Sequence, residues 1–337
     1  MAKRVVDGSQ QTVRYHVNDL LSSHINKKVN DNFLTWLQKT FGKYKPVTSK
    51  RGKVHEFLGM ELDFSVRNEV HIKQFAHVQD MIDSCPVKIK KDAAAPTPAG
   101  NALFSEGKSN LLQKDMKEKY HTCVAKGLFV SKRSRPDILP TISVLTTRVR
   151  NPNHQDLEKL VRCCKYLNAT KDIYLKLKQK DLNVLKIYVD AAYGVHDDCR
   201  SHSGLVAKFG QGSALFASRK QRLNTRSSTE AELVAVDDYI GMVLWTNNFL
   251  DAQGYGIDRN ILYQDNRSAM LLEENGRSSA GKRSKHLNVR YFFVKDVIDS
   301  GRLEVSHSPT EEMVGDFMTK PLQGAKFKEF RFLLLGM

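Results

Sequence analysis

The stretch KIYVDAAYG, residues 186–194, contains the feature that decides the fold of the second half of this chain. The apolar segment 185–189 leads directly into Asp190, which small residues follow. A short apolar run with β-branched and aromatic side chains favours a buried strand. A carboxylate at the end of such a strand is costly unless it is paired, hydrated or bound to metal. The pattern therefore predicts a core strand that ends in a functional carboxylate.

The residues after this strand predict a mixed sheet flanked by helices. Two further strands complete a meander, and a long helix begins after the N-cap candidates Ser227, Ser228 and Thr229 and ends before Gly254. In chain order we expect strands 185–189, 204–209 and 214–217, helix 230–252, strand 261–264, helices 268–274 and 287–300, strand 303–307 and helix 310–320. The expected fold class is thus α/β, with a five-stranded mixed sheet.

Four carboxylates lie at informative positions in this half. Asp190 ends the first strand, and Glu232 lies in the first turn of the long helix. Asp265 ends the fourth strand, and Asp316 lies in the closing helix. Hard oxygen ligands of this kind suit Mg²⁺ or Mn²⁺, and two such ions can activate a water and stabilise the leaving 3′ oxygen of a phosphodiester. Taken singly, each acid has an ordinary alternative as a turn former, a helix-dipole partner or a solvated residue.

Five blocks in the second half carry a resemblance to known proteins. They are KIYVDAAYG (186–194), SRKQRLNTRSSTEAELVA (218–235), YQDNRSAMLL (263–272), SKHLNVRYFFV (284–294) and PTEEMVGDFMTKPL (309–322). They resemble, in the same order, the blocks of the ribonuclease H domain in copia-type retrotransposon polyproteins. The resemblance implies a ribonuclease H-like fold and a metal-dependent endonuclease that hydrolyses the RNA strand of RNA/DNA hybrids. It places the four metal-binding carboxylates on Asp190, Glu232, Asp265 and Asp316.

Two histidines and a basic loop are further candidates. His307 lies shortly before Asp316, where ribonucleases H commonly carry a histidine that helps proton transfer or product release. His286 has two open interpretations, because it either orients substrate or caps and packs a helix. The basic loop beside it is expected to contact phosphates through Lys282, Arg283 and Lys285.

The first half resembles the end of the reverse transcriptase in the same polyproteins. TVRYHVNDLLSS (12–23) is similar to the polymerase hairpin, and KVHEFLGMELDFS (53–65) to the region that grips the primer end. SRPDILPTISVLTTR (134–148) and HQDLEKLVRCCKYL (154–167) are similar to the thumb and connecting helices.

The polymerase hairpin departs from the family pattern Tyr-His-Val-Asp-Asp. Asn18 replaces the first aspartate, so that only Asp19 remains, and a neutral amide is a poor substitute for a carboxylate that bridges two Mg²⁺ ions. The fingers and the earlier palm strand precede this hairpin in the family, and we expect them to be missing here. We therefore expect a vestigial polymerase site without activity. We interpret the chain as a truncated element. Either it is a decayed copy, or the start of its gene has been mispredicted at Met1. Its last residues resemble the natural end of such polyproteins.

Charge is unevenly distributed along the chain. Residues 1–180 contain 33 Lys and Arg against 17 Asp and Glu, whereas residues 181–337 contain 20 of each. A basic surface of this size favours a polyanion such as nucleic acid, although scattered solvated lysines are the plainer alternative. The five cysteines form no C-x-x-C pair, which indicates a reducing compartment and argues against disulfides and zinc. No signal peptide or membrane-length apolar run is present in the sequence.

Four segments follow from these patterns. We expect a partial reverse transcriptase palm remnant (1–90), thumb and connection helices (91–180), a ribonuclease H-like domain (181–323) and a C-terminal tail (324–337). The first two should contain strands 12–17, 54–66 and 69–72 and helices 30–41, 74–84, 116–131, 137–147 and 156–168.

The expected partners are an RNA/DNA hybrid and either an intact reverse transcriptase or other Pol products, with no membrane. The expected location is cytoplasmic, in a retrotransposon particle, or nuclear. Two alternatives are a non-catalytic nucleic-acid-binding remnant and a metal-dependent recombinase or integrase of related fold. The blocks around Glu232 and Asp265 favour ribonuclease H over the recombinase.

Overall fold

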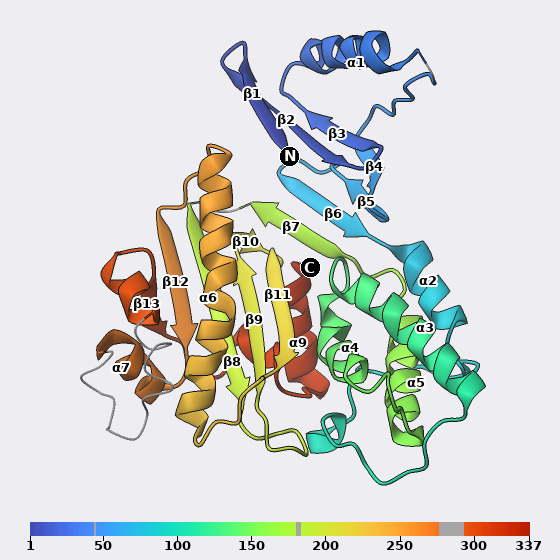
Figure 1. Cartoon of the computed structure of the whole chain (residues 1–337), viewed down its shortest axis with the longest axis vertical. Helices are drawn as coiled ribbons and strands as arrows, with labels where there is room; N and C mark the ends of the chain where they lie inside the picture. The colour runs from blue at the N-terminus through green and yellow to red at the C-terminus, as the bar shows by residue number, and fades with distance from the viewer. Residues whose placement is uncertain (44, 180–182, 276–292) are drawn as a thin grey trace. The chain divides into compact units, whose positions relative to one another are not determined.

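The computed structural model describes residues 1–43, 45–179, 183–275 and 293–337. The chain, drawn in Figure 1, divides into two compact units, residues 1–67 and 68–337. Each unit has its own buried residues. Among the described residues, no helix is both long enough and apolar enough to span a membrane.

The first unit is built around a three-stranded antiparallel sheet. Its elements are β1 (Ala2–Val6), β2 (Ser9–His16), β3 (Asp19–Ser23), helix α1 (Lys27–Phe41) and the hairpin of β4 (Val54–Phe57) and β5 (Met60–Asp63). Among the described residues of this unit, only Val29, Phe57 and Leu62 are buried hydrophobic side chains. Trp36 and Phe41 on α1 remain exposed. This unit therefore has very little core of its own.

The segment 54–66, expected as a single strand, is instead a tight hairpin. Leu58 and Gly59 have φ values of 54° and 72°, and this left-handed pair reverses the chain between β4 and β5. Two consecutive left-handed residues are typical of two-residue hairpin turns, in which glycine adopts a positive φ without steric cost. The expected strand was wrong because the apolar pattern runs through the turn without interruption.

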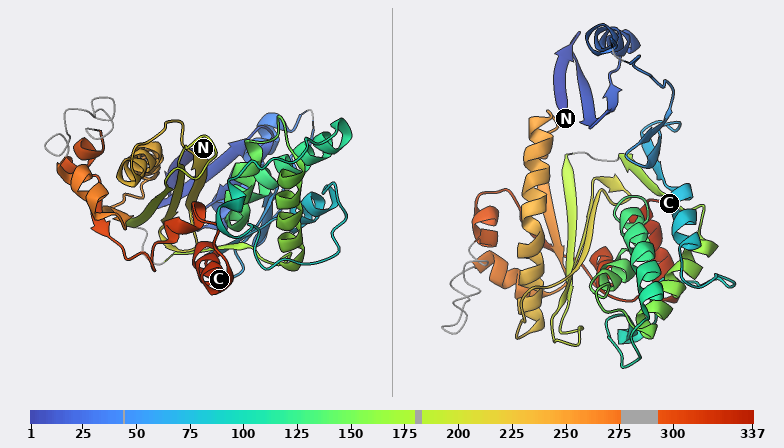
Figure 2. Two further views of the ribbon diagram at one scale, coloured as in Figure 1. Left: turned by 90° about the horizontal axis from the view of Figure 1, so that it is seen from below. Right: turned by 45° about the vertical axis from the view of Figure 1, so that its right-hand side comes forward.

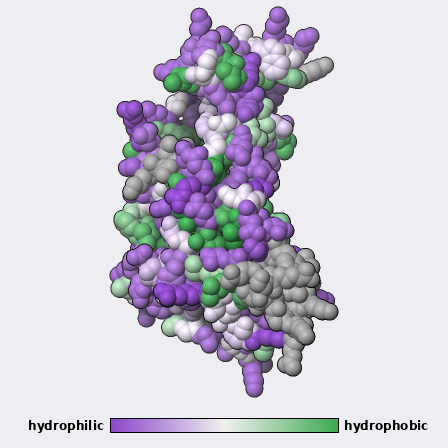
Figure 3. All heavy atoms as spheres, turned by 90° about the vertical axis from the view of Figure 1, so that its left-hand side faces the viewer, coloured by the Kyte–Doolittle hydropathy of each residue, from purple (hydrophilic) through white to green (hydrophobic). Residues whose placement is uncertain are grey.

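The second unit contains the expected five-stranded mixed sheet, which confirms the predicted fold class. Its strands are β8 (Val184–Ala192), β9 (His202–Lys208), β11 (Leu215–Lys220), β12 (Arg259–Gln264) and β13 (Glu304–His307). Their order in the sheet is β11-β9-β8-β12-β13, with an antiparallel meander on one side and parallel pairing of β12 with β8 and β13 on the other. Figure 3 shows the side on which β13 lies in Figure 1, and hydrophilic residues predominate there.

The two faces of this sheet bury different helices. Figures 1 and 2 place the long helix α6 (Ser228–Ala252) on one face and α9 (Gly324–Leu335) on the other. Ile187 and Val189 of β8 pack in the cluster with α6, whereas Tyr188 packs in the cluster on the opposite side. This alternation follows from the two-residue period of a strand. The side chain of Ser227 caps α6 by accepting a hydrogen bond from the Glu230 backbone N–H.

Helices from the first half of the chain share the core on the α9 side. The elements are α2 (Phe75–Asp83), α3 (Lys114–Ser131), α4 (Leu139–Thr146) and α5 (His154–Ala169), with a small antiparallel sheet of β6 (Glu69–Lys73), β7 (Leu175–Gln179) and β10 (Gly210–Gln211). Leu160 of α5 and Val206 of β9 belong to one hydrophobic cluster. The expected boundary at residue 180 therefore falls inside a single compact unit.

The end of the chain is more structured than a tail. Phe327, Phe330 and Leu334 of α9 are buried in the same cluster, and Gly336 ends the helix in the left-handed conformation. The closing helix expected over 310–320 is wrong, because only a short 3₁₀ helix, η4 (Val314–Met318), forms there. The expected helix 287–300 is described only over 293–299, which is helical, and helix α7 (Arg267–Asn275) lies near its expected position.

Candidate active site

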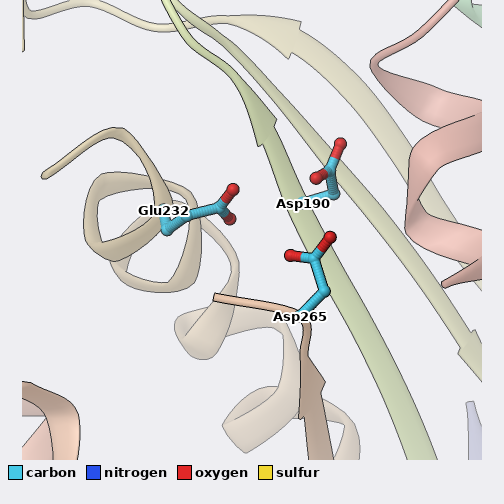
Figure 4. A group of neighbouring side chains, drawn as sticks. All are labelled: Asp190, Glu232 and Asp265. Atoms are coloured by element: carbon cyan, nitrogen blue, oxygen red, sulfur yellow. The ribbon is translucent and has the colours of Figure 1, made fainter. Parts of the chain in front are cut away.

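Three acidic side chains meet at one end of the main sheet. Asp190 lies near the end of β8, Asp265 directly follows β12, and Glu232 lies near the start of α6. Because β8 and β12 are parallel neighbours, their carboxyl ends reach the same edge of the sheet. Figure 4 shows the three carboxylates facing one another, and one oxygen from each lies within 4.8 Å of the others. The structure thus brings together three of the four predicted carboxylates.

Burial and mutual repulsion make this cluster unfavourable without a cation. Asp190 is 1% exposed and Glu232 is 5% exposed. Burial raises the pKa of both carboxyl groups, and a neighbouring aspartate adds to each rise, Asp265 for Asp190 and Asp190 for Glu232. Oε2 of Glu232 has no hydrogen-bond partner among the described residues. A buried and unsatisfied carboxylate oxygen favours a bound cation.

Asp316, the fourth predicted carboxylate, is linked to the cluster through a lysine. It lies on η4 and is not part of the group whose oxygens all lie within 4.8 Å. Nζ of Lys320 lies 2.7 Å from Oδ1 of Asp316 and 3.6 Å from Oδ1 of Asp190. Burial, followed by repulsion from Asp190, raises the pKa of Asp316 to about 7. The same two aspartates raise the pKa of Lys320, although its partial burial acts in the opposite direction.

Two glycines allow η4 to approach the sheet closely. Gly204 of β9 pairs with Asp190, and a Cβ added at Gly204 would lie only 2.7 Å from Cβ of Met318. A Cβ added at Gly315 would lie 3.3 Å from Cβ of Asp190. Because real Cβ atoms do not approach within 3 Å, Gly204 is needed where it stands. The absence of these two side chains lets Asp316 lie beside β8.

The cleft and its surroundings contain residues that sequence reasoning missed. A cleft of about 510 Å³ is lined by the three carboxylates together with Asn266, Arg267, Ser268 and Lys320. The hydroxyl of Thr319 donates a hydrogen bond to Oδ2 of Asp190. Asn266, Arg267 and Ser268 follow Asp265 directly, and Lys320 lies four residues after Asp316, so proximity in sequence was the available signal.

The remaining predicted residues lie away from the three clustered carboxylates or outside the described residues. His307 ends β13, is exposed, and pairs in register with Gln264, the residue before Asp265. Asn18 and Asp19 are exposed at the turn between β2 and β3, and Asp19 pairs with His16. The expected basic loop and its histidine, Lys282, Arg283, Lys285 and His286, lie outside the described residues.

Comparisons with known proteins place this geometry in context. The chain is 27% identical over 317 residues to the retrovirus-related Pol polyprotein from transposon RE1 of Arabidopsis thaliana, covering 94% of the chain and 21% of that polyprotein. It is 26% identical over 287 residues to the Pol polyprotein from transposon TNT 1-94 of Nicotiana tabacum, covering 82% of the chain and 21% of that polyprotein. The resemblance to copia-type retrotransposon Pol polyproteins is confirmed.

The Pol-like chain spans about a fifth of the length of these polyproteins. A putative transposon Ty5-1 protein of Saccharomyces cerevisiae is closer in length, since 26% identity over 230 residues covers 68% of the chain and 72% of that protein. No family model matches the sequence. The similarity extends through both halves of the Pol-like chain, and together with the fold it supports a role in retrotransposon Pol.

Two solved structures are among those to which the chain shows a low structural similarity. A ribonuclease H1 in complex with an RNA/DNA hybrid is 13% identical, with a TM-score of 0.32 over 40% of this chain and 93% of that one. The foamy viral protease-reverse transcriptase in complex with an RNA/DNA hybrid is 14% identical, with a TM-score of 0.48 over 88% of this chain and 36% of that one. At these scores neither structure assigns an activity to the Pol-like chain.

Proposed function

We propose that this chain is a ribonuclease H that hydrolyses the RNA strand of an RNA/DNA hybrid with two divalent ions, Mg²⁺ or Mn²⁺. The observation that carries the proposal is the convergence of Asp190, Glu232 and Asp265 at one edge of the sheet. Asp316 completes the set from η4, next to Asp190 and Lys320. The similarity to retrotransposon Pol polyproteins supports the same function.

The residues of the cluster fit a hard divalent cation. All their ligand atoms are carboxylate oxygens, which Mg²⁺ and Mn²⁺ prefer, and no sulfur or nitrogen ligand belongs to the group. Oε2 of Glu232 lacks a hydrogen-bond partner among the described residues, and the Glu232 carboxylate faces the other two carboxylates. When bound, the two ions supply an activated water and stabilise the leaving 3′ oxygen of the phosphodiester.

The chain's own residues bind and orient the substrate. Ionised oxygens of Asp190, Glu232 and Asp265 form the cation-binding edge, and the hydroxyl of Thr319 fixes the rotamer of Asp190. Arg267 and Lys320 line the cleft as cations, where they attract the phosphates of the hybrid. His307, on the neighbouring strand, is proposed to accept or return a proton through an imidazole nitrogen. Discrimination of the RNA strand would come from contacts to its 2′-hydroxyls.

We propose in addition that the polymerase site is inactive. Asn18 and Asp19 lie at an exposed hairpin turn, and the carboxylate group that could hold a cation among the described residues does not include Asp19. The second candidate function, a non-catalytic nucleic-acid-binding remnant, is favoured by the excess of basic residues over 1–180. The proposed partners are the hybrid and either an intact reverse transcriptase or other Pol products, in a cytoplasmic particle or in the nucleus.

One assay separates these two functions. The purified full chain is incubated with an end-labelled RNA/DNA hybrid, with Mg²⁺ or with a chelator, and the RNA and DNA strands are followed separately. We expect Mg²⁺-dependent cleavage of the RNA strand and none of duplex DNA. Asp19→Asn serves as the matched control, because it removes an exposed aspartate far from the nuclease cluster in the sequence. Binding without cleavage in Mg²⁺ and in Mn²⁺ would reject the nuclease in favour of the binding remnant.

A further inference from the structure

Lys320 lies against the carboxylate site as a built-in cation. Its Nζ is 2.7 Å from Oδ1 of Asp316 and 3.6 Å from Oδ1 of Asp190. The neighbouring residue, Thr319, donates its hydroxyl proton to Oδ2 of Asp190. Both oxygens of Asp190 are therefore in contact with one dipeptide. Lys320 also lines the cleft onto which the three clustered carboxylates open.

The local backbone holds Lys320 in this position. The backbone N–H groups of Thr319 and Lys320 both donate to the carbonyl of Asp316, so the turn after η4 directs the lysine back over the aspartate. Met318 is fully buried and anchors this turn against the sheet. The side chain of Asp316 is only 7% exposed, whereas that of Lys320 is 38% exposed. The lysine therefore reaches from the rim of the cleft toward a buried acid.

A surface pair of the same spacing shows how different this environment is. Lys295 and Asp299 also form an i,i+4 ion pair with a distance of 2.7 Å, but the side chain of Asp299 is 57% exposed. Solvent screens such a pair, and its removal has little effect. The Lys320–Asp316 pair lies beside a second buried carboxylate, Asp190, so the ammonium neutralises a site that is otherwise strongly anionic.

We propose that Lys320 competes with one of the two cations for the Asp190–Asp316 side of the site. A first ion binds to Asp190, Glu232 and Asp265. Of these three carboxylates, only Asp190 contacts a lysine of the described residues, and that lysine is Lys320. A second ion that uses Asp316 has to displace the ammonium from it. The two ions consequently bind with unequal affinity, and Lys320 sets the difference. This inference rests on the proposed function, because it presupposes that the cluster binds cations.

Two charge-removing variants and one charge-conserving variant test this competition. Lys320→Met keeps the aliphatic stem without the charge, Lys320→Gln keeps a hydrogen-bond donor without the charge, and Lys320→Arg keeps the charge. Mn²⁺ binding to the full chain is measured by calorimetry and by the electron paramagnetic resonance of free Mn²⁺, without nucleic acid. We expect the weaker Mn²⁺ to bind on the order of 10-fold more tightly in the Met and Gln variants. Lys320→Arg should remain close to the wild type.

The controls separate this inference from the proposed function. Lys295→Met removes a lysine from the surface pair and should leave both Mn²⁺ affinities unchanged. Asp265→Asn should weaken the tighter ion, and if it does not, the metal cluster and the competition are both rejected. If Asp265→Asn weakens binding but the Met and Gln variants bind both ions as the wild type does, or more weakly, the competition alone is rejected. Thermal unfolding verifies that each variant is folded. If Lys320→Met is not folded, Mn²⁺ binding by Lys320→Gln alone tests the competition.

Discussion

Resemblance assigns two acidic sites of the chain to metal binding, and the two sites differ in burial and in charge. Asp190 and Glu232 are almost completely buried at the edge of a five-stranded sheet, and they face a third carboxylate. Asp19 is exposed at the start of β3, and Asn18 beside it is neutral. The first arrangement concentrates negative charge in a low-dielectric environment, whereas the second leaves one acid in water.

The difference in burial shows which of the two acidic sites costs the protein stability when nothing is bound there. Buried carboxylates with raised pKa values destabilise a protein unless something binds to them, so a cluster of them indicates a ligand. An exposed aspartate in a hairpin turn costs nothing and indicates nothing. The unit that carries it also has few buried hydrophobic side chains, in contrast to the extensive core of residues 68–337. The predictions below test this contrast.

The largest expected effect is the loss of cleavage when a clustered carboxylate is neutralised. Loss of outer-shell partners of metal ligands costs about 10–100-fold, so Asp190→Asn or Asp265→Asn should lower the rate of hybrid cleavage by more than about 100-fold. Asp19→Asn should leave the rate unchanged. Single-turnover rates on a labelled hybrid measure both. Undiminished cleavage by Asp190→Asn or Asp265→Asn would falsify the site assignment.

A smaller effect is expected when lysines of the basic half are neutralised. Residues 1–180 hold the whole excess of positive charge, and Lys90 and Lys91 are exposed there. If both contact phosphate, the double change to Gln should weaken hybrid binding about 10-fold. It should also reduce the slope of log affinity against log salt by about 2. Affinity titrations of the full chain across a range of salt concentrations measure both quantities.

The matched control for this experiment uses the electrically neutral half. Lys186 and Lys328 are equally exposed, and changing both to Gln should affect binding less. The full chain is used because helices of residues 91–180 share a core with the main five-stranded sheet, so a fragment starting at 181 would lose that packing. Equal losses of affinity in the two double variants would mean that the basic half contributes no more to hybrid binding than the neutral half does.

Glu273 offers a test of how burial acts close to the site. It is fully buried on α7, accepts a hydrogen bond from Nε2 of Gln264, and burial raises its pKa from 4.5 to about 8. Between these values the folded state retains a proton that the unfolded state has lost. Stability should therefore be fully present below pH 4.5 and decline as the pH rises toward 8.

Replacing this glutamate by its neutral isostere should remove the decline. Glu273→Gln should be more stable than the wild type at pH 8, on the order of a few kcal/mol, with little difference at pH 5. Urea unfolding without divalent ions at both pH values measures this difference. Glu329→Gln, which changes an exposed glutamate on α9, is the control. If the difference in unfolding free energy between the wild type and Glu273→Gln is the same at pH 5 and at pH 8, Glu273 is already ionised in the folded state at pH 5.

The sequence pattern was sufficient where the determinants are local. The apolar run before Asp190 and the caps before α6 each lie within a few residues of what they determine, and the strands and the long helix were predicted close to their observed bounds. The contacts that complete the site are not local. Thr319 contacts Asp190 across 129 residues, and Gly204 matters only because Met318 packs against it. No periodicity in either segment carries that information, so Thr319 and the short form of η4 became evident only in the fold.

The smallest expected effect is none at all. Asn18→Asp restores the first aspartate of the family's hairpin pattern, and if that residue were the only defect, the change would return DNA synthesis. We expect primer extension on a primed template to stay at background, because both side chains at this turn are exposed and the carboxylate cluster found among the described residues does not include Asp19. A nucleotidyl-transfer site needs several converging carboxylates to hold its ions, and two adjacent acids on one turn do not provide them. The measurement is extension of a labelled primer by the wild type and by the variant, with Mg²⁺ and with Mn²⁺. Extension by the Asn18→Asp variant but not by the wild type would break the contrast between the two acidic sites, since an exposed hairpin acid would then be part of a working metal site.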